Sequence, residues 1–201
     1  MSGSDFRAPA PPAVDSPAFR AEIVEVRRVA DSRTSEQVRI AQYWEGLSGS
    51  FNAGLWNQIA RNAITAHGLD EAAAARLLAQ MHMAGVDGNV ACHDSKYVHW
   101  VPRPTQIDPD IRLAIAVPNH PSYPSNHACI SGAMGAVLDA WFPDEGGKYS
   151  RMAREAGESR LYGGIHYRID VDQGFVIAGK VSERAVAIGV PADKPFAPAG
   201  K

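Results

Sequence analysis

Residues 124–142 read PSNHACISGAMGAVLDAWF, and this stretch predicts a long helix from Ser125 to about Phe142. A serine is a favourable first residue, because its side chain can accept a hydrogen bond from the unpaired N–H groups of the first turn. Small residues then recur along the helix, at Ala128, Gly132, Ala133, Gly135 and Ala136. Because the distance between packed helices depends on the side chains between them, we expect other helices to approach this one closely.

Helical periodicity continues on both sides of this stretch. Thr34 and Gln37 have the spacing of a capping box, and Asp70 can cap a further helix that runs toward Ala91. No segment shows the alternation of a β-strand, so we expect an all-α fold, a helical bundle with its active site at helix ends and connecting loops. The expected helices cover residues 34–46, 55–64, 70–91, 125–142, 148–156 and 167–188, and a proline-rich connection precedes Ser125.

The distribution of prolines suggests where the domain begins and ends. Prolines gather near the start of the chain, and we expect residues 1–33 to form an extended arm. Residues 191–201, which contain three further prolines, are expected to form an extended tail. The intervening residues 34–190 are long enough for one helical catalytic domain with its own core.

Composition excludes some classes of partner. The net charge of −2 provides no broad basic surface, so we expect no nucleic acid, and any bound anion needs a local cluster of cations. No apolar run is long enough to span a membrane, and no signal peptide is visible near the start, which leaves the compartment undecided. A homo-oligomer is compatible with the sequence. Cys92 and Cys129 are expected to be buried free thiols.

Two segments place potential anion ligands beside prolines or a helix start. Lys96 and Arg103 lie on either side of a short run that ends in Pro102. An arginine offers a two-pronged donor to an oxyanion and a lysine offers a point charge, although two such cations are more often part of a solvated surface. In the second segment, Ser125 and His127 lie at the start of the predicted helix, where unpaired N–H groups attract anions. Simple capping by Ser125 is the alternative there.

A third segment reads SRLYGGIHYRID, residues 159–170. If the last helix begins near His166, the spacing to Asp170 puts both side chains on one face. A carboxylate that binds one imidazole nitrogen fixes the tautomer and leaves the other nitrogen available to attack or to ligate. The glycine pair at 163–164 allows the backbone to bring Arg160 and His166 together. An ordinary His–Asp pair at the surface is the alternative interpretation.

Together the three segments resemble the signature of the superfamily that contains type 2 phosphatidic-acid phosphatases, bacterial acid phosphatases and vanadium-dependent haloperoxidases. That signature reads Lys-x6-Arg-Pro, Pro-Ser-Gly-His and Ser-Arg-x5-His-x3-Asp, and the chain departs from it only at Asn126, where the family has glycine. The resemblance implies that residues 34–190 bind one phosphate- or vanadate-sized oxyanion. The implied oxyanion ligands are Lys96, Arg103, Ser125, the Asn126 amide, Arg160 and His166.

The resemblance also implies roles in catalysis. His166, oriented by Asp170, would be the axial residue, and His127 would be the acid–base group. In a haloperoxidase, His166 would ligate the vanadium of a vanadate cofactor, and the substrates would be hydrogen peroxide and a halide. In an acid phosphatase, which needs no cofactor, His166 would form a phosphohistidine with a phosphomonoester while His127 protonates the leaving alcohol.

One residue outside the signature favours the haloperoxidase. His120 occupies a position where algal bromoperoxidases also have histidine, and a histidine that changes charge near neutral pH could tune bound peroxide and select the halide. We therefore expect a bromide-type vanadate haloperoxidase. An acid phosphatase is the first alternative, and a phosphate- or vanadate-binding protein without turnover is the second, supported only by Asn126.

Overall fold

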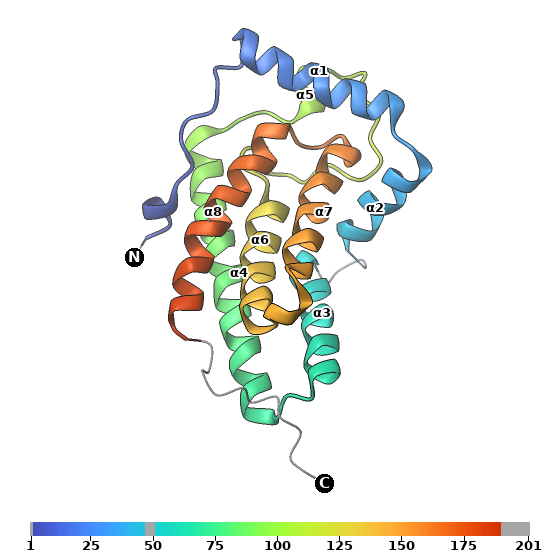
Figure 1. Ribbon diagram of the computed structural model, residues 1–201. Coiled ribbons are helices and arrows are strands. Elements are labelled where there is room, and N and C mark those ends of the chain that lie inside the picture. Colours follow the sequence, from blue (N-terminus) through green and yellow to red (C-terminus); the bar gives the residue numbers. More distant parts are fainter. Residues whose placement is uncertain (1, 47–50, 190–201) are drawn as a thin grey trace.

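The computed structural model describes residues 2–46 and 51–189, and every regular element in these ranges is helical, which confirms the predicted all-α fold (Figure 1). In chain order the elements are η1 (Gly3–Phe6), α1 (Pro17–Ser32), α2 (Ser35–Glu45), α3 (Phe51–His67), α4 (Glu71–His99), α5 (Pro104–Ile107), α6 (Asn126–Trp141), η2 (Pro143–Glu145), α7 (Lys148–Gly163) and α8 (Arg168–Ala187).

Helix α6 lies in the middle of the bundle, with α4, α7 and α8 beside it (Figure 1). Its small residues explain this position. A Cβ atom added at Gly132 would come within 2.6 Å of the Ala178 side chain of α8, and one added at Gly135 would come within 2.8 Å of the Tyr149 carbonyl of α7. The close packing of α7 and α8 against α6 therefore depends on the pattern of small residues.

The capping motifs set the helix starts as expected. The Thr34 side chain accepts from the Gln37 N–H and the Gln37 side chain accepts from the Thr34 N–H, which forms the capping box of α2. The Asp70 carboxylate accepts from the Ala73 N–H and starts α4. However, α4 continues to His99 and α7 to Gly163, well beyond the predicted ends. Polar residues that point inward occupy both extensions, so an apolar pattern could not reveal them.

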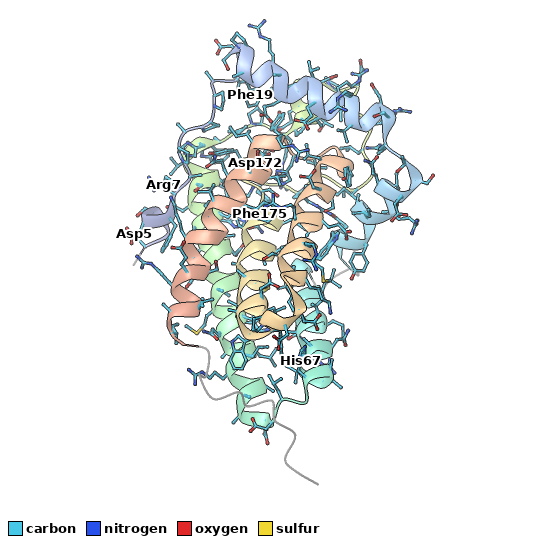
Figure 2. The ribbon with its side chains drawn as sticks, viewed as in Figure 1. Asp5, Arg7, Phe19, His67, Asp172 and Phe175 are labelled. Atoms are coloured by element: carbon cyan, nitrogen blue, oxygen red, sulfur yellow. The ribbon has the colours of Figure 1, made fainter. Side chains whose placement is uncertain are left out.

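The expectation that residues 1–33 form an extended arm is wrong for α1. Ser16 caps this helix, with its hydroxyl accepting from the Phe19 N–H, and Pro17 follows at the first helical position. Phe19, labelled in Figure 2, lies near the start of α1 and is fully buried. Its ring centroid is 4.8 Å from that of Tyr167. Residues 7–16 have no regular helix, as expected. The predicted tail, residues 191–201, lies outside the described residues.

Two further expectations concern membrane-spanning helices and the two cysteines. Within the described ranges, no helix has both the length and the apolar character needed to cross a bilayer. Cys92 and Cys129 are buried free cysteines on α4 and α6, as the sequence predicted.

Candidate functional site

The three sequence segments meet at one end of the bundle. Helices α4 and α7 end there, α6 and α8 begin there, and α1 lies across the same end (Figure 1). The site is therefore built from helix ends and the loops between them, as the sequence suggested. Lys96, Arg103, Ser125, Arg160, His166 and Asp170 are all buried in it, and His120 and His127 are partly exposed.

His166 and Asp170 form the predicted pair. The Nδ1 atom of His166 lies 2.7 Å from Oδ2 of Asp170. Because a carboxylate only accepts, Nδ1 carries the proton and the lone pair of Nε2 faces the other way. Nε2 accepts from Nη1 of Arg103 at 2.9 Å. The imidazole is thus held in the tautomer that presents a lone pair on Nε2.

Ser122 completes this arrangement and was not predicted. Its hydroxyl donates to Oδ2 of Asp170 at 2.5 Å, and the Tyr167 N–H donates to the same oxygen at 3.1 Å. Burial raises the pKa of Asp170 to about 6, while the Ser122 hydrogen bond and the charge of Lys96 oppose that rise. Ser122 lies in an irregular loop and matches no motif, so nothing in the sequence marked it.

Arg103 connects two loops to His166. Its Nη1 donates to the carbonyl of Ile165 at 2.8 Å, and its Nε donates to the carbonyl of His120 at 3.0 Å. Its Nη2 lies 3.2 Å from Nδ1 of His120. The predicted oxyanion ligand therefore also fixes the position of His120 next to His166.

His120 behaves differently from the expectation. Burial, together with the charges of Lys96 and Arg103, lowers the pKa of His120 to about 4. The imidazole is therefore neutral at neutral pH, and the contact with Arg103 uses its Nδ1 as an acceptor. Burial above all, and then the two cations, therefore argue against the change of charge near neutral pH for which His120 was singled out.

Lys96 lies beneath the loop that precedes α6. Its ammonium donates to the carbonyls of Pro121, Ser122 and Pro124 at 2.8, 2.8 and 2.5 Å. Burial lowers the pKa of Lys96 to about 8. The lysine thus holds this loop against α4 and places a positive charge under the first turn of α6.

Arg160 and His127 both contact the C-terminal end of α2. Arg160 donates from Nη1 to Glu45 at 2.7 Å and from Nη2 to the carbonyl of Ala41 at 2.9 Å. Nε2 of His127 lies 2.7 Å from the carbonyl of Trp44, so Nε2 carries the proton. None of these three α2 residues belongs to the signature, and Glu45 in particular was missed because a single carboxylate at a helix end has no distinguishing pattern.

The start of α6 supplies further donors. Ser125 is the N-cap of α6, but its hydroxyl does not bond to the helix and has no hydrogen-bond partner among the described residues, although it is buried. The simple capping role is therefore not what the Ser125 side chain performs. The first N–H groups of α6, including that of Asn126, lack partners within the helix and favour an anion.

The electrostatics of the site are dominated by positive charge. In the described part of the chain, Lys96, Arg103 and Arg160 are buried here with Asp170 as the buried carboxylate. Burial lowers the pKa of Arg103 and of Arg160 to about 10. Burial and the three cations also lower the pKa of His166 well below its usual range. Such an excess of buried positive charge is costly unless an anion compensates it.

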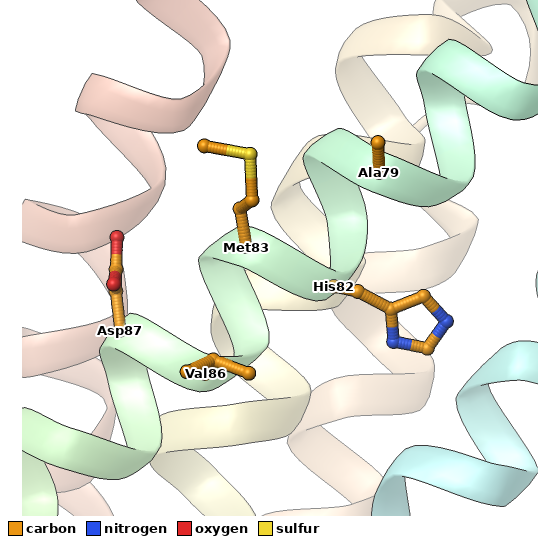
Figure 3. A pocket seen from close by; sticks show the side chains of 5 residues that line it. All are labelled: Ala79, His82, Met83, Val86 and Asp87. Atoms are coloured by element: carbon orange, nitrogen blue, oxygen red, sulfur yellow. The ribbon is translucent and has the colours of Figure 1, made fainter.

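A hollow elsewhere on the molecule is not part of this site. It has a volume of about 360 Å³ and lies on the outer face of α4, lined by Ala79, His82, Met83, Val86 and Asp87 (Figure 3). An α-helix rises about 1.5 Å per residue, so Met83 lies roughly 20 Å along α4 from Lys96. The hollow is mostly apolar and lacks the cations that an oxyanion requires.

Comparison with known proteins identifies a matching family. The sequence model of the PAP2 superfamily matches residues 73–188, which is more than half of the chain. The chain belongs to the PAP2 superfamily. The match includes all three signature segments and confirms the resemblance seen in the sequence, while no curated protein sequence matches the chain.

Two solved structures are similar to this PAP2 chain. The crystal structure described as that of the first bacterial vanadium-dependent iodoperoxidase has 28% sequence identity and a TM-score of 0.82, over 92% of this chain and 53% of the other. The chain therefore spans about half the length of that protein. A transmembrane PAP2-type phosphatidylglycerolphosphate phosphatase from Bacillus subtilis has 18% identity and a TM-score of 0.60, over 88% of each chain, and shares the fold.

Proposed function

We propose that this PAP2 protein is a vanadate-dependent haloperoxidase, which oxidises halide with hydrogen peroxide. The observation that carries the proposal is the likeness to the vanadium-dependent iodoperoxidase, because it extends over 92% of the chain at a TM-score of 0.82. The phosphatase has a lower identity, and its likeness indicates the fold alone.

The residues at the site fit vanadate. A tetrahedral oxyanion needs several convergent donors, and the cations Lys96, Arg103 and Arg160 all act on His166 with their positive charge. The buried Ser125 hydroxyl has no partner in the described ranges and can donate to an oxygen. The lone pair of His166 Nε2 can bond to the metal. When bound, vanadate would supply Lewis-acid activation of peroxide.

The other proposed roles follow from the hydrogen bonds. Asp170 keeps the proton of His166 on Nδ1, so that Nε2 remains a ligand. His127 would exchange protons with peroxide. The neutral His120 would orient Arg103 and would form part of the surface of the site that contacts halide.

Both bromide and iodide are proposed as substrates. His120 led to a bromide-type prediction, and the similar structure is named an iodoperoxidase. Iodide gives up electrons more readily than bromide, so an enzyme that oxidises bromide should also oxidise iodide. Parallel rates with the two halides measure the preference.

A phosphomonoesterase is the second candidate, supported by membership of the PAP2 superfamily. Here His166 Nε2 would attack phosphorus, the bond to the alcohol oxygen would break, and His127 would give that oxygen a proton. Water would then release phosphate from the phosphohistidine. A binding protein without turnover is the third candidate, and measurable turnover in either assay excludes it.

One pair of assays separates the candidates. Protein loaded with vanadate is given peroxide with bromide or iodide, and vanadate-free protein is given a phosphomonoester. We expect halide oxidation that requires vanadate. Hydrolysis of the phosphomonoester without any halide oxidation would instead favour the phosphatase. His166→Ala, checked for intact helical circular dichroism, should abolish the halide reaction, and retention of most activity would contradict the assignment of His166.

A further inference from the structure

A row of rings leads from the site to the surface. His120 lies next to Arg103, and its ring centroid is 5.4 Å from that of His93 on α4. The rings of His93 and Tyr97 are 6.2 Å apart, and those of Tyr97 and Trp100 are 5.5 Å apart. Because Arg103 also contacts His166, a series of direct contacts joins His166, the proposed vanadium ligand, to Trp100.

Exposure to solvent rises along this row. Arg103 and His166 are buried, His120 and His93 are partly exposed, and the exposed fractions of Tyr97 and Trp100 are 50% and 67%. His120 is thus the partly exposed member of this row that contacts a buried cation, Arg103. The row of His120, His93, Tyr97 and Trp100 is called the ring row below.

The end of the ring row has an unusual backbone. Trp100 terminates α4 in the left-handed conformation, with φ of 50°, a position that glycine usually occupies. Bulky residues rarely adopt this conformation, and those that do are concentrated at functional sites. The strained backbone at the end of α4 places the exposed Trp100 indole beside Tyr97. A glycine at this position would end the helix without strain.

We propose that the oxidised halide leaves the site along the ring row and that Tyr97 is a site of halogenation. The proposal rests on the proposed haloperoxidase activity, which supplies the hypohalous acid. The proposal also predicts a class of organic substrate. A phenol that binds against Tyr97 and Trp100 would be halogenated by the same hypohalous acid.

The chemical step is an electrophilic substitution. The halogen–oxygen bond of hypohalous acid breaks as a carbon–halogen bond forms ortho to the Tyr97 hydroxyl. The displaced ring proton joins the released hydroxide as water. Peroxide has already oxidised the halide, so this step needs no further oxidant.

Tyr43 offers a matched control. Its exposed fraction is 51%, almost equal to that of Tyr97. It lies on α2, and its ring contacts that of Trp44, which is fully buried. His127 contacts the backbone carbonyl of Trp44. Tyr43 is thus equally accessible from bulk solvent but lies off the ring row.

The experiment compares two sources of hypoiodous acid. In one, vanadate-loaded protein turns over peroxide and iodide in the presence of excess methionine, which consumes reagent that has escaped. In the other, hypoiodous acid is added directly to vanadate-free protein. Peptide mass spectrometry measures iodination of Tyr97 and Tyr43, and triiodide formation without methionine measures turnover separately.

We expect several-fold more iodine on Tyr97 than on Tyr43 during turnover, and near-equal labelling by added reagent. Tyr97→Phe should lose this label and keep its vanadate affinity. Equal labelling during turnover, or preference for Tyr43, would overturn the proposed exit while triiodide formation still supported the haloperoxidase. A preference for Tyr97 with added reagent also would overturn it, because local reactivity would then be sufficient. Absence of triiodide would overturn the haloperoxidase proposal and this inference together.

Discussion

Lys96 shows, at the scale of single residues, how the site prepares for an anion. Its ammonium is buried and bonded to three carbonyls, which are neutral partners, so its charge is only partly compensated. The lowered pKa of about 8 reflects the free-energy cost of burying the charged ammonium. A bound oxyanion would favour the charged form and raise the pKa again, which links anion binding to uptake of a proton.

The affinity for inorganic phosphate should therefore depend on pH. Below pH 8 Lys96 is charged with and without the anion, so affinity is full. Above pH 8 the ligand-free protein loses this proton, and binding must restore it, so affinity should fall as pH rises. Calorimetric titration between pH 7 and pH 9 measures this, because the charge of phosphate is nearly constant from pH 8 upward and Arg103 and Arg160, with pKa values of about 10, keep their protons. Lys96→Arg keeps its charge over this range and should remove the dependence; an unchanged profile would contradict the assignment.

Glu45 competes with the proposed anion for Arg160. Its carboxylate accepts from Nη1 of Arg160, and its side chain is 37% exposed, which weakens the pair. Glu45→Gln should tighten phosphate binding by about 1 kcal/mol, or roughly fivefold. Glu155→Gln is a suitable control, because this substitution also removes one negative charge nearby. Glu155 accepts a hydrogen bond from Nε1 of Trp44 and not from Arg160. Weaker binding in Glu45→Gln would show instead that Glu45 is needed to position Arg160.

The signature residues could be identified from sequence because their chemistry is distinctive in type and spacing. Their partners could not. Ser122, Ala41 and Trp44 act through one hydroxyl or through backbone carbonyls, and any residue type supplies a carbonyl. Ligand types can be inferred from a motif, whereas the acceptors around them are set by the path of the backbone.

At the scale of elements, α8 contains a useful pair of glycines. A Cβ added at Gly174 would come within 2.8 Å of the Ser125 carbonyl and 2.6 Å of the Ala128 side chain, at the first turn of α6. Gly174→Ala should cost about 1–3 kcal/mol of unfolding free energy and weaken phosphate binding, because α6 must move. A Cβ at Gly179 would meet nothing within 4 Å, so Gly179→Ala should stabilise the protein by about 0.5–1 kcal/mol. Urea unfolding measures both; equal effects would contradict the close contact at Gly174.

Helix α1 supports the start of α8 from outside the signature. Glu22 accepts from the Ile169 N–H at 3.0 Å, and Glu25 binds Arg168 at 3.0 Å. Glu22→Ala should lose about 0.5–2 kcal/mol, the usual value of a helix cap, and Glu22→Gln should recover most of it because the amide oxygen still accepts. Thermal unfolding of the two variants provides the comparison. Equal stability of both variants and wild type would show that this contact contributes nothing.

The periodicity of apolar residues predicted most helices. It did not predict the helix segments whose buried residues are polar. The ends of α4 and α7 bury Lys96 and Arg160, so the apolar stripe stops before the helix does. Helix α1 was missed because prolines dominated the preceding residues. Ser16 followed by Pro17 is nevertheless an N-cap with proline at the first helical position, and this signal could have revealed it.

At the scale of the whole molecule, one helical bundle with α1 across its end brings together residues from Lys96 to Asp170. The chain spans 53% of the iodoperoxidase to which it is similar, and all the signature segments lie within the residues that match the PAP2 family model. The central claim is that these segments form one oxyanion site that vanadate and phosphate share.

Calorimetric titration of vanadate, with and without excess phosphate, tests this claim most directly. At a pH below the pKa of Lys96, where its charge is retained, we expect one vanadate per chain and an apparent affinity that falls in proportion to the phosphate present. His166→Ala should lose vanadate affinity more than phosphate affinity, because only the metal uses the lone pair on Nε2. Vanadate affinity that is unchanged by excess phosphate would contradict a shared site.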